Sequence, residues 1–153
     1  MATIKDSGER RSFSTGAVRD IQEGKGRPVL MPLRVAAKLM DSLTEKDYVL
    51  QELAMFVQYK TTTNLYNALT AFATLAYGYS TETMLLEVSK HFEEGARKYG
   101  DNNWQKGSPV ECYMDSAIRH YLKYKRGDKD EPHDRAFVWN VMCCIWEVDY
   151  HHD

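Results

Sequence analysis

Apolar residues recur every three or four positions along most of the chain after residue 30, a spacing that places them on one face of an α-helix. Six such stripes occur. They are made of Val35, Ala36, Leu39, Met40 and Leu43; Val49, Leu50, Leu53, Phe56 and Val57; Leu65, Ala68, Leu69, Phe72 and Leu75; Leu85, Val88 and Phe92; Val110, Met114, Ala117, Ile118, Tyr121 and Leu122; and Phe137, Val138, Val141, Ile145 and Trp146. The pattern predicts an all-α fold of about six helices in a compact bundle.

Capping and helix-breaking residues predict the ends of the first three helices. Pro32 suits a first helical position, and Thr44 followed by Asp47 resembles a capping pattern. The third helix is expected from about Asn64 to a stop at Gly78.

Similar signals bound the later helices. The fourth is expected between a Ser80 cap and Gly100. In the fifth, Ser108 is expected to cap, Pro109 to take the first helical position and Glu111 to reach back to the cap amide. The charged turn GDKDEP at 127–132 precedes the sixth, and its proline opens that helix.

The segment before the first helix has a different character. Residues 12–27, SFSTGAVRDIQEGKGR, lack sustained periodicity and carry three glycines, which is typical of an extended arm or ordered loop. We therefore expect a single domain over 1–153, with an N-terminal arm or loop at 1–30 and a helical core at 31–150.

Composition narrows the class of protein. The 22 acidic and 20 basic side chains nearly cancel, so no overall charge attracts nucleic acid. The polar first eleven residues do not resemble a signal peptide, and no apolar run approaches the length of a membrane span, so we expect a cytoplasmic protein with no membrane partner. Cys112, Cys143 and Cys144 fall inside apolar helical patterns and are expected to be reduced and buried.

A divalent-metal site is one interpretation of the acidic positions. Glu87, His91 and Glu94 share one face of the fourth helix, and Asp115 on the fifth helix would either join them or pair with Arg119. A solvated polar face explains the same residues.

Two known metal patterns fit poorly. All-helical nucleotide pyrophosphohydrolases carry ExxE on one helix and ExxD on the next, and both spacings are missing here. His133-Asp134 matches the dipeptide of HD phosphohydrolases, but Asp134 is explained equally by the dipole of a helix N-terminus.

The stretch HFEEGARKYGDNNWQKG at 91–107 predicts a nucleotide pocket. An aromatic ring stacks a base, amides read its edge, and cations hold phosphate. The candidates are Phe92 or Trp104 for stacking, Asn102 and Asn103 for the base edge, and Arg97, Lys98 and Lys106 for charge, with Arg19 and the GKGR segment ending at Arg27 as a second phosphate clamp. The alternative is a helix end in which Trp104 fills the core and the asparagines form a turn.

Three long motifs resemble a known family. STGAVRDIQEGKGR with LMPL, LEVSKHFEEGARKYGDNNWQKG and DSAIRHYLKYKRGDKDEPHDRAFVWN are similar to the dATP/dGTP diphosphohydrolase N-terminal domain family, over most of residues 13–146. The helices expected at 45–78 resemble an insertion of a shorter, phage-borne branch. The family name implies Mg²⁺ or Mn²⁺ at Glu87, Glu93 and Asp115 and cleavage of a purine dNTP to the monophosphate and pyrophosphate.

Within that branch, the chain resembles phage anti-Thoeris sponge proteins, which sequester cyclic ADP-ribose isomers without degrading them. This resemblance implies a non-enzymatic homo-oligomer, from dimer to hexamer, with no cofactor and no catalytic residue. It also implies that Phe92 stacks on the base, that Asn102 hydrogen-bonds the ligand, and that Arg119 contacts phosphate in a second kind of site for cyclic di- or trinucleotides. Sequestration of a cyclic nucleotide is the leading hypothesis, and hydrolysis of a purine dNTP is the alternative.

Overall fold

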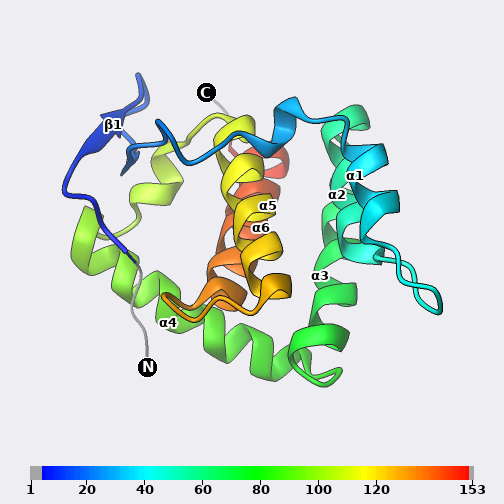
Figure 1. Ribbon diagram of the computed structural model, residues 1–153. Coiled ribbons are helices and arrows are strands. Elements are labelled where there is room, and N and C mark those ends of the chain that lie inside the picture. Colours follow the sequence, from blue (N-terminus) through cyan, green and yellow to red (C-terminus); the bar gives the residue numbers. More distant parts are fainter. Residues whose placement is uncertain (1–4, 152–153) are drawn as a thin grey trace.

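The computed structural model describes residues 5–151 and confirms the all-α fold with six α-helices (Figure 1). The elements are β1 (Arg10–Ser12), β2 (Val18–Asp20), α1 (Leu33–Met40), α2 (Tyr48–Tyr59), α3 (Thr62–Ala76), α4 (Thr81–Tyr99), α5 (Val110–Arg126) and α6 (His133–Asp149). Short 3-10 helices cover Pro28–Leu30 and Asn103–Lys106.

Helices α5 and α6 lie side by side at the centre of the molecule, joined by the turn that GDKDEP forms (Figure 1). Helices α1, α2 and α3 cover one side of this pair, and α4 packs against α6 at the other side. The N-terminal arm crosses over the top of α5 and ends in a small hairpin beyond it, on the side away from α1 and α2 (Figure 1).

Aromatic rings from three helices form the centre of the core. Phe72 on α3 is fully buried, with ring-centroid distances of 4.5 Å to Phe137 and 6.1 Å to Tyr121. Such buried aromatic pairs add packing energy beyond the burial of apolar area. The apolar stripes of α3, α5 and α6 thus meet as their spacing predicts.

Some helix ends agree with the sequence and others do not. The Ser80 side chain accepts from Thr83 N, as expected, and α4 ends before Gly100. The second helix is capped by Asp47, whose carboxylate accepts from Leu50 N at 2.9 Å, so the expectation for Thr44 was wrong by three residues.

The expected cap of the fifth helix is also wrong. Pro109 is the cap residue, and no side-chain cap hydrogen bond forms there. The backbone N–H of Ser108 donates to Glu147 Oε1 on α6 at 2.8 Å, so a distant carboxylate has taken the amide that Glu111 was expected to reach. A tertiary contact replaces the local capping box.

The stripe expected on the first helix is largely exposed. Val35 and Leu39 are 56% and 80% accessible, and Leu43 lies beyond the helix end. Leu33 and Ala37 are the buried residues of α1. A short helix that packs on α2 and the neighbouring 3-10 turn leaves its remaining apolar face toward solvent.

The N-terminal arm, expected to be an extended arm or ordered loop, contains a short two-stranded hairpin. Its two strands pair in antiparallel register, with Arg11 opposite Arg19. Among the described residues, none of the helices is both long and apolar enough to cross a membrane. Cys112, Cys143 and Cys144 are buried and free, as expected, and burial raises the pKa of the Cys144 thiol to about 12.

Candidate functional site

One buried carboxylate holds the N-terminal arm on the helical core. Asp115 on α5 is fully buried. Its Oδ1 accepts from the N–H of Val29 at 3.0 Å, and its Oδ2 accepts from Gln22 Nε2 at 2.7 Å and Arg27 Nε at 2.9 Å. A buried ionised group is tolerated only with such partners, so Asp115 joins three separate arm positions to α5.

Two further contacts hold the arm, one at the hairpin and one at Gly26. The Asn103 side chain accepts from Val18 N at 3.0 Å and donates to Val18 O at 2.9 Å, in the manner of a neighbouring strand. Arg119 Nη1 donates to Gly26 O at 2.6 Å. The arm is therefore a fixed wall rather than a loose tail.

Between this wall and helices α4, α5 and α6 lies a polar cavity of about 480 Å³. We call it the arginine cavity. Six cationic side chains and three carboxylates line it; they are Lys5, Arg11, Arg19, Lys25, Arg119 and Lys123, and Asp6, Asp20 and Glu131. Its volume lies within the range of about 300–1,000 Å³ that is usual for small-molecule sites.

Arg19 lies at the centre of the cavity wall. Its Nη2 donates to Ser116 Oγ at 2.9 Å and to Asn140 Oδ1 at 3.0 Å. Its guanidinium carbon lies 4.9 Å from the Tyr113 ring centroid and 5.8 Å from that of Trp139. Aromatic faces and neutral oxygens position this cation without neutralising it.

Two more arginines that line the cavity, Arg119 and Arg11, are partly buried. Burial lowers the pKa of Arg119, the nearby Asp115 raises it in part, and Arg19 and Arg11 lower it again. Burial is also the main cause of the lowered pKa of Arg11. Arg119 Nη2 reaches the same hydroxyl, Ser116 Oγ, at 3.1 Å. The cavity thus gathers guanidiniums that disfavour one another and that an anion would stabilise.

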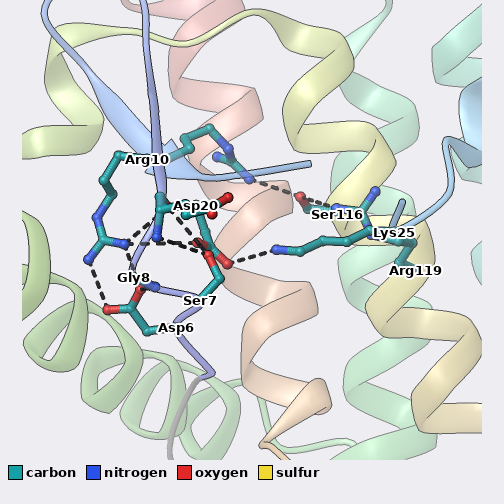
Figure 2. Close-up of polar contacts among 10 residues, drawn as sticks. Asp6, Ser7, Gly8, Arg10, Asp20, Lys25, Ser116 and Arg119 are labelled. Carbon is teal, nitrogen blue, oxygen red and sulfur yellow. Dashed lines mark hydrogen bonds and ion pairs between the residues drawn. The ribbon is translucent and has the colours of Figure 1, made fainter. Parts of the chain in front are cut away.

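Two of the three carboxylates, Asp6 and Asp20, already have partners (Figure 2). Asp20 accepts from Lys25 Nζ at 2.8 Å and from Ser7 Oγ at 2.5 Å. Burial alone would raise the pKa of Asp20, but these hydrogen bonds outweigh it and lower the pKa. Asp6 pairs with Arg10, which holds its pKa at about 2. Figure 2 also shows Ser116 and Arg119 of α5, which lie across the cavity from Asp6 and Asp20.

His91 of α4 is buried and faces the same cavity. Burial and the nearby Arg135 lower the pKa of its imidazole to about 4, so the ring is neutral at pH 7. Its Nδ1 has no hydrogen-bonding partner within the described part of the chain.

A smaller cavity of about 190 Å³ adjoins the first and is lined by the predicted aromatic and amide residues. Phe92, Asn102, Asn103 and Trp104 line it. The two cavities are adjacent, because four residues line both of them: Gly95, Tyr99, Asn103 and Trp139. We call the smaller one the aromatic cavity.

The aromatic rings of this region form one cluster. The Phe92 centroid lies 5.8 Å from those of both Trp104 and Trp139, and Trp104 meets Trp146 at 5.1 Å. Trp104 therefore packs against the core while also facing the cavity. Asn102 is exposed in the left-handed conformation (φ 60°), so it also forms the turn. The helix-end interpretation of the 91–107 stretch describes these contacts, and the nucleotide pocket stays a prediction for which Phe92, Asn102, Asn103 and Trp104 share one cavity.

The other predicted cations lie apart from the two cavities. The side chain of Arg97 is 70% exposed and pairs with Glu93 at 3.5 Å on the surface of α4. Arg27 is bound to Asp115 rather than turned inward, and Asp115 raises its pKa. Arg19 and Arg119 are thus the predicted arginines that line the arginine cavity.

The three carboxylates implied for a catalytic metal have separate partners. Glu87 pairs with Lys90 at 3.1 Å and Glu93 with Arg97 at 3.5 Å, while Asp115 holds the arm. None of the metal-ligand groups formed by the described residues includes any of the three. They do not fit a shared Mg²⁺ or Mn²⁺ site.

His133 and Asp134, which together resemble an HD dipeptide, point to different partners. Asp134 accepts from the Tyr77 hydroxyl at 3.1 Å. His133 Nδ1 lies 2.9 Å from His120 Nδ1 on α5. The dipeptide therefore does not act as one unit.

Sequence reasoning missed several residues of the arginine cavity. Arg11, Ser116, Asn140, His120 and Trp139 line it, and none of them was a candidate, although all but Arg11 lie within the motif DSAIRHYLKYKRGDKDEPHDRAFVWN. The sequence alone does not show that the face of α6 that carries Asn140 packs against β2.

These features define a small all-α protein with a basic cavity closed by its own N-terminal arm. Comparison with known families gives a match to dATP/dGTP diphosphohydrolase, N-terminal, over residues 67–152, and the chain belongs to this family. The match begins within α3, so it does not include the arm or α2. Searches of curated proteins and of solved structures gave no match.

Proposed function

We propose that this protein binds a nucleotide through its phosphate groups in the arginine cavity and sequesters it without cleaving it. The observation that carries the proposal is the group formed by Arg11, Arg19 and Arg119, which line one cavity, are each partly buried, and form no ion pair with any described residue. Charge-assisted hydrogen bonds from guanidinium to phosphate are strong and often bidentate. A bound phosphate would supply the missing negative charge.

The adjoining aromatic cavity suits the base of the same ligand. Tyr99, Asn103 and Trp139 line both spaces, so one molecule can reach from phosphate to base. Phe92 and Trp104 offer aromatic surface, and Asn102 is an exposed amide at the mouth. Base stacking on an aromatic ring contributes about 1–3 kcal/mol. Arg97, exposed on α4, is assigned at most a peripheral contact.

The resemblance to phage sponge proteins supplies the ligand class in this proposal. It points to cyclic ADP-ribose isomers and, at a second kind of site, cyclic di- or trinucleotides. These signals arise inside the infected cell, so the protein would act in the host cytoplasm. No protein, nucleic-acid or membrane partner is invoked beyond further copies of this chain.

Exposed apolar surface supports the homo-oligomer in this proposal. A groove of about 410 Å³, lined by Tyr66, Leu85, Phe92, Trp146 and Tyr150 among others, runs beside the aromatic cavity. Leu85 and Tyr150 are 46% and 62% accessible. A second chain seated there would cover this surface and close the base pocket.

The second candidate is a metal-dependent diphosphohydrolase acting on dATP or dGTP, which the description of the matched family favours. Cleavage requires a metal held near the phosphates to neutralise charge and activate water. The separate partners of Glu87, Glu93 and Asp115 argue against these ligands.

The test measures binding and turnover together. Purified protein is incubated with a cyclic ADP-ribose isomer or, separately, with dATP or dGTP and Mn²⁺, and the ligand is released by heat and analysed by chromatography. Sequestration predicts that the cyclic ligand is protein-bound and recovered intact. Release of pyrophosphate from either dNTP would favour the second candidate.

Single substitutions locate the site. Arg119→Gln should weaken binding of the cyclic ligand at least about tenfold, since a hydrogen bond to a charged group contributes about 1.5–3 kcal/mol. Phe92→Ala should weaken it by a similar factor, since base stacking contributes about 1–3 kcal/mol. Arg97→Gln, on the exposed face of α4, is the matched control and should change affinity less than about threefold. Equal affinity in all three variants would contradict the assignment.

A further inference from the structure

A cluster of imidazoles and carboxylates joins the ends of α5 and α6, at the edge of the arginine cavity. His120, Glu131 and His133 each offer one ligand atom, and these atoms lie within 4.8 Å of one another. His120 and Glu131 line the arginine cavity, whereas Glu131 and His133 line a separate depression on the other side. The cluster thus forms a partition between two open spaces.

The hydrogen bonds of His133 orient it as metal-bound histidines are oriented. Its Nε2 donates to Asp130 Oδ1 at 2.7 Å. Metal-ligating histidines almost always give their second N–H to a carboxylate or carbonyl, which fixes the tautomer and leaves the other nitrogen for the metal. The other nitrogen, Nδ1, accepts a hydrogen bond from His120 Nδ1 at 2.9 Å, and a metal ion would replace the proton between these two nitrogens.

The distance between the two imidazole nitrogens suits a shared ion. Two nitrogens bound to one tetrahedral Zn²⁺ lie about 3.3 Å apart, given bond lengths of roughly 2.0–2.1 Å. A separation of 2.9 Å needs only a few tenths of an ångström of movement. Glu131 is half-buried and unbranched, so its carboxylate can approach to complete the set.

A second possible set of metal ligands lies nearby and is a weaker candidate for the ion. Asp128, Asp130 and His133 also lie within the same limit. However, Asp128 pairs with Arg126 at 2.5 Å, and Asp130 pairs with Lys5 at 2.7 Å as well as with His133. Their oxygens are already committed to cations of the protein.

We propose that His120, Glu131 and His133 form a binding site for one divalent transition-metal ion of the Zn²⁺ class, with Asp130 as the carboxylate that orients His133. Imidazole donors favour Zn²⁺, Co²⁺ and Ni²⁺ over Mg²⁺ and Ca²⁺. Three protein ligands leave a fourth position for water or for an oxygen of a ligand in the arginine cavity. This site is distinct from Glu87, Glu93 and Asp115, and it does not depend on the identity of the nucleotide.

The experiment uses the full chain and the metal alone. Co²⁺ is titrated while its visible d–d absorption is followed, and Zn²⁺ affinity is then measured by competition with a chromophoric chelator. One equivalent of Co²⁺ should bind, and Zn²⁺ should displace it. The same titration of a chain carrying His151→Gln and His152→Gln should give the same result, which separates the site from the imidazoles near the C-terminus.

Two substitutions and a matched control identify the ligands. Glu131→Gln, at a half-buried position, should weaken Zn²⁺ binding at least tenfold, and His120→Gln should abolish the Co²⁺ absorption, with far-UV circular dichroism confirming that each variant is folded. Asp128→Asn should bind as the unmodified chain does. The proposal is overturned if no saturable binding occurs, if binding survives His120→Gln, or if Asp128→Asn loses as much affinity as Glu131→Gln.

Discussion

Replacement of Asp115 by asparagine should release the N-terminal arm from the helical core. The side chain keeps its size, but the negative charge is lost and one of its two acceptor oxygens becomes an NH₂ group. That NH₂ group must face either the N–H of Val29 or the donors of Gln22 and Arg27, so at least one of three hydrogen bonds is lost.

The magnitude follows from the kind of bond and its burial. A hydrogen bond to a charged group contributes about 1.5–3 kcal/mol, and a neutral one about 1 kcal/mol. The Arg27 side chain is 45% exposed and can turn to water, which limits its share. A loss of about 3 kcal/mol in the free energy of unfolding is expected.

Two measurements separate release of the arm from unfolding of the whole chain. Urea unfolding is followed by tryptophan fluorescence, and trypsin cleavage is followed at the arginines and lysines of residues 10–27. Asp115 holds the arm, which is one wall of the arginine cavity. Trypsin should therefore cleave the arm faster in Asp115→Asn than in the unmodified chain, before the helices unfold. Glu111→Gln, exposed on the same helix, is the matched control. A change below about 0.5 kcal/mol with unaltered cleavage would refute the role of Asp115.

Three further predictions concern stability. His91 has a folded pKa of about 4 against 6.5 unfolded, so the unfolded chain binds the extra proton, and the free energy of unfolding should fall by about 3 kcal/mol as pH drops from 6.5 to 4. This part of the pH dependence, measured by urea unfolding at several pH values, should be absent in His91→Gln. Tyr121→Phe removes a hydroxyl that donates to Asp47 at 2.7 Å and should cost about 2 kcal/mol in the same assay. Gly95→Ala, inside α4 with open space around the new methyl group, should raise the thermal midpoint, whereas Gly127→Ala, at φ 89°, should lower it by the equivalent of about 1 kcal/mol.

Each of these has a result that would contradict it. The pH prediction fails if the unmodified chain and His91→Gln lose stability in parallel below pH 6.5. An unchanged urea midpoint in Tyr121→Phe would mean that water replaces the hydroxyl. If Gly95→Ala and Gly127→Ala shift the thermal midpoint in the same direction, backbone conformation is not what distinguishes the two positions.

The sequence alone determined the helices and most of the core. Phe72, Tyr121 and Phe137 lie on apolar stripes, and all three are buried in the structure. Periodicity predicts such faces because each helix must bury one side. The Ser80 cap and the Gly100 stop were also readable, since both depend on neighbours in the chain. The family was readable too, because its motifs are continuous segments.

Contacts between distant segments were decided only by the tertiary structure. Glu147 takes the amide of Ser108, and Asp115 binds the arm rather than Arg119 four residues away. Local rules cannot anticipate either contact, because a closer or better-buried partner from another element competes with the local one. For the same reason, the two predicted groups of phosphate-binding cations fared differently: Arg97 of the 91–107 stretch lies outside the cavities, and Arg19 of the second clamp lines the arginine cavity.

The candidate sites therefore depend on how the elements meet. The residues of the arginine cavity come from the arm and from α4, α5 and α6. Their spacing in the sequence does not indicate that these four elements pack together. The cluster of His120, Glu131 and His133 exists because the turn after α5 folds α6 back alongside it. Sequence determined which side chains were present and which faces were apolar. Packing of the faces determined which polar groups were buried together, and hence where charge and ligand atoms are concentrated.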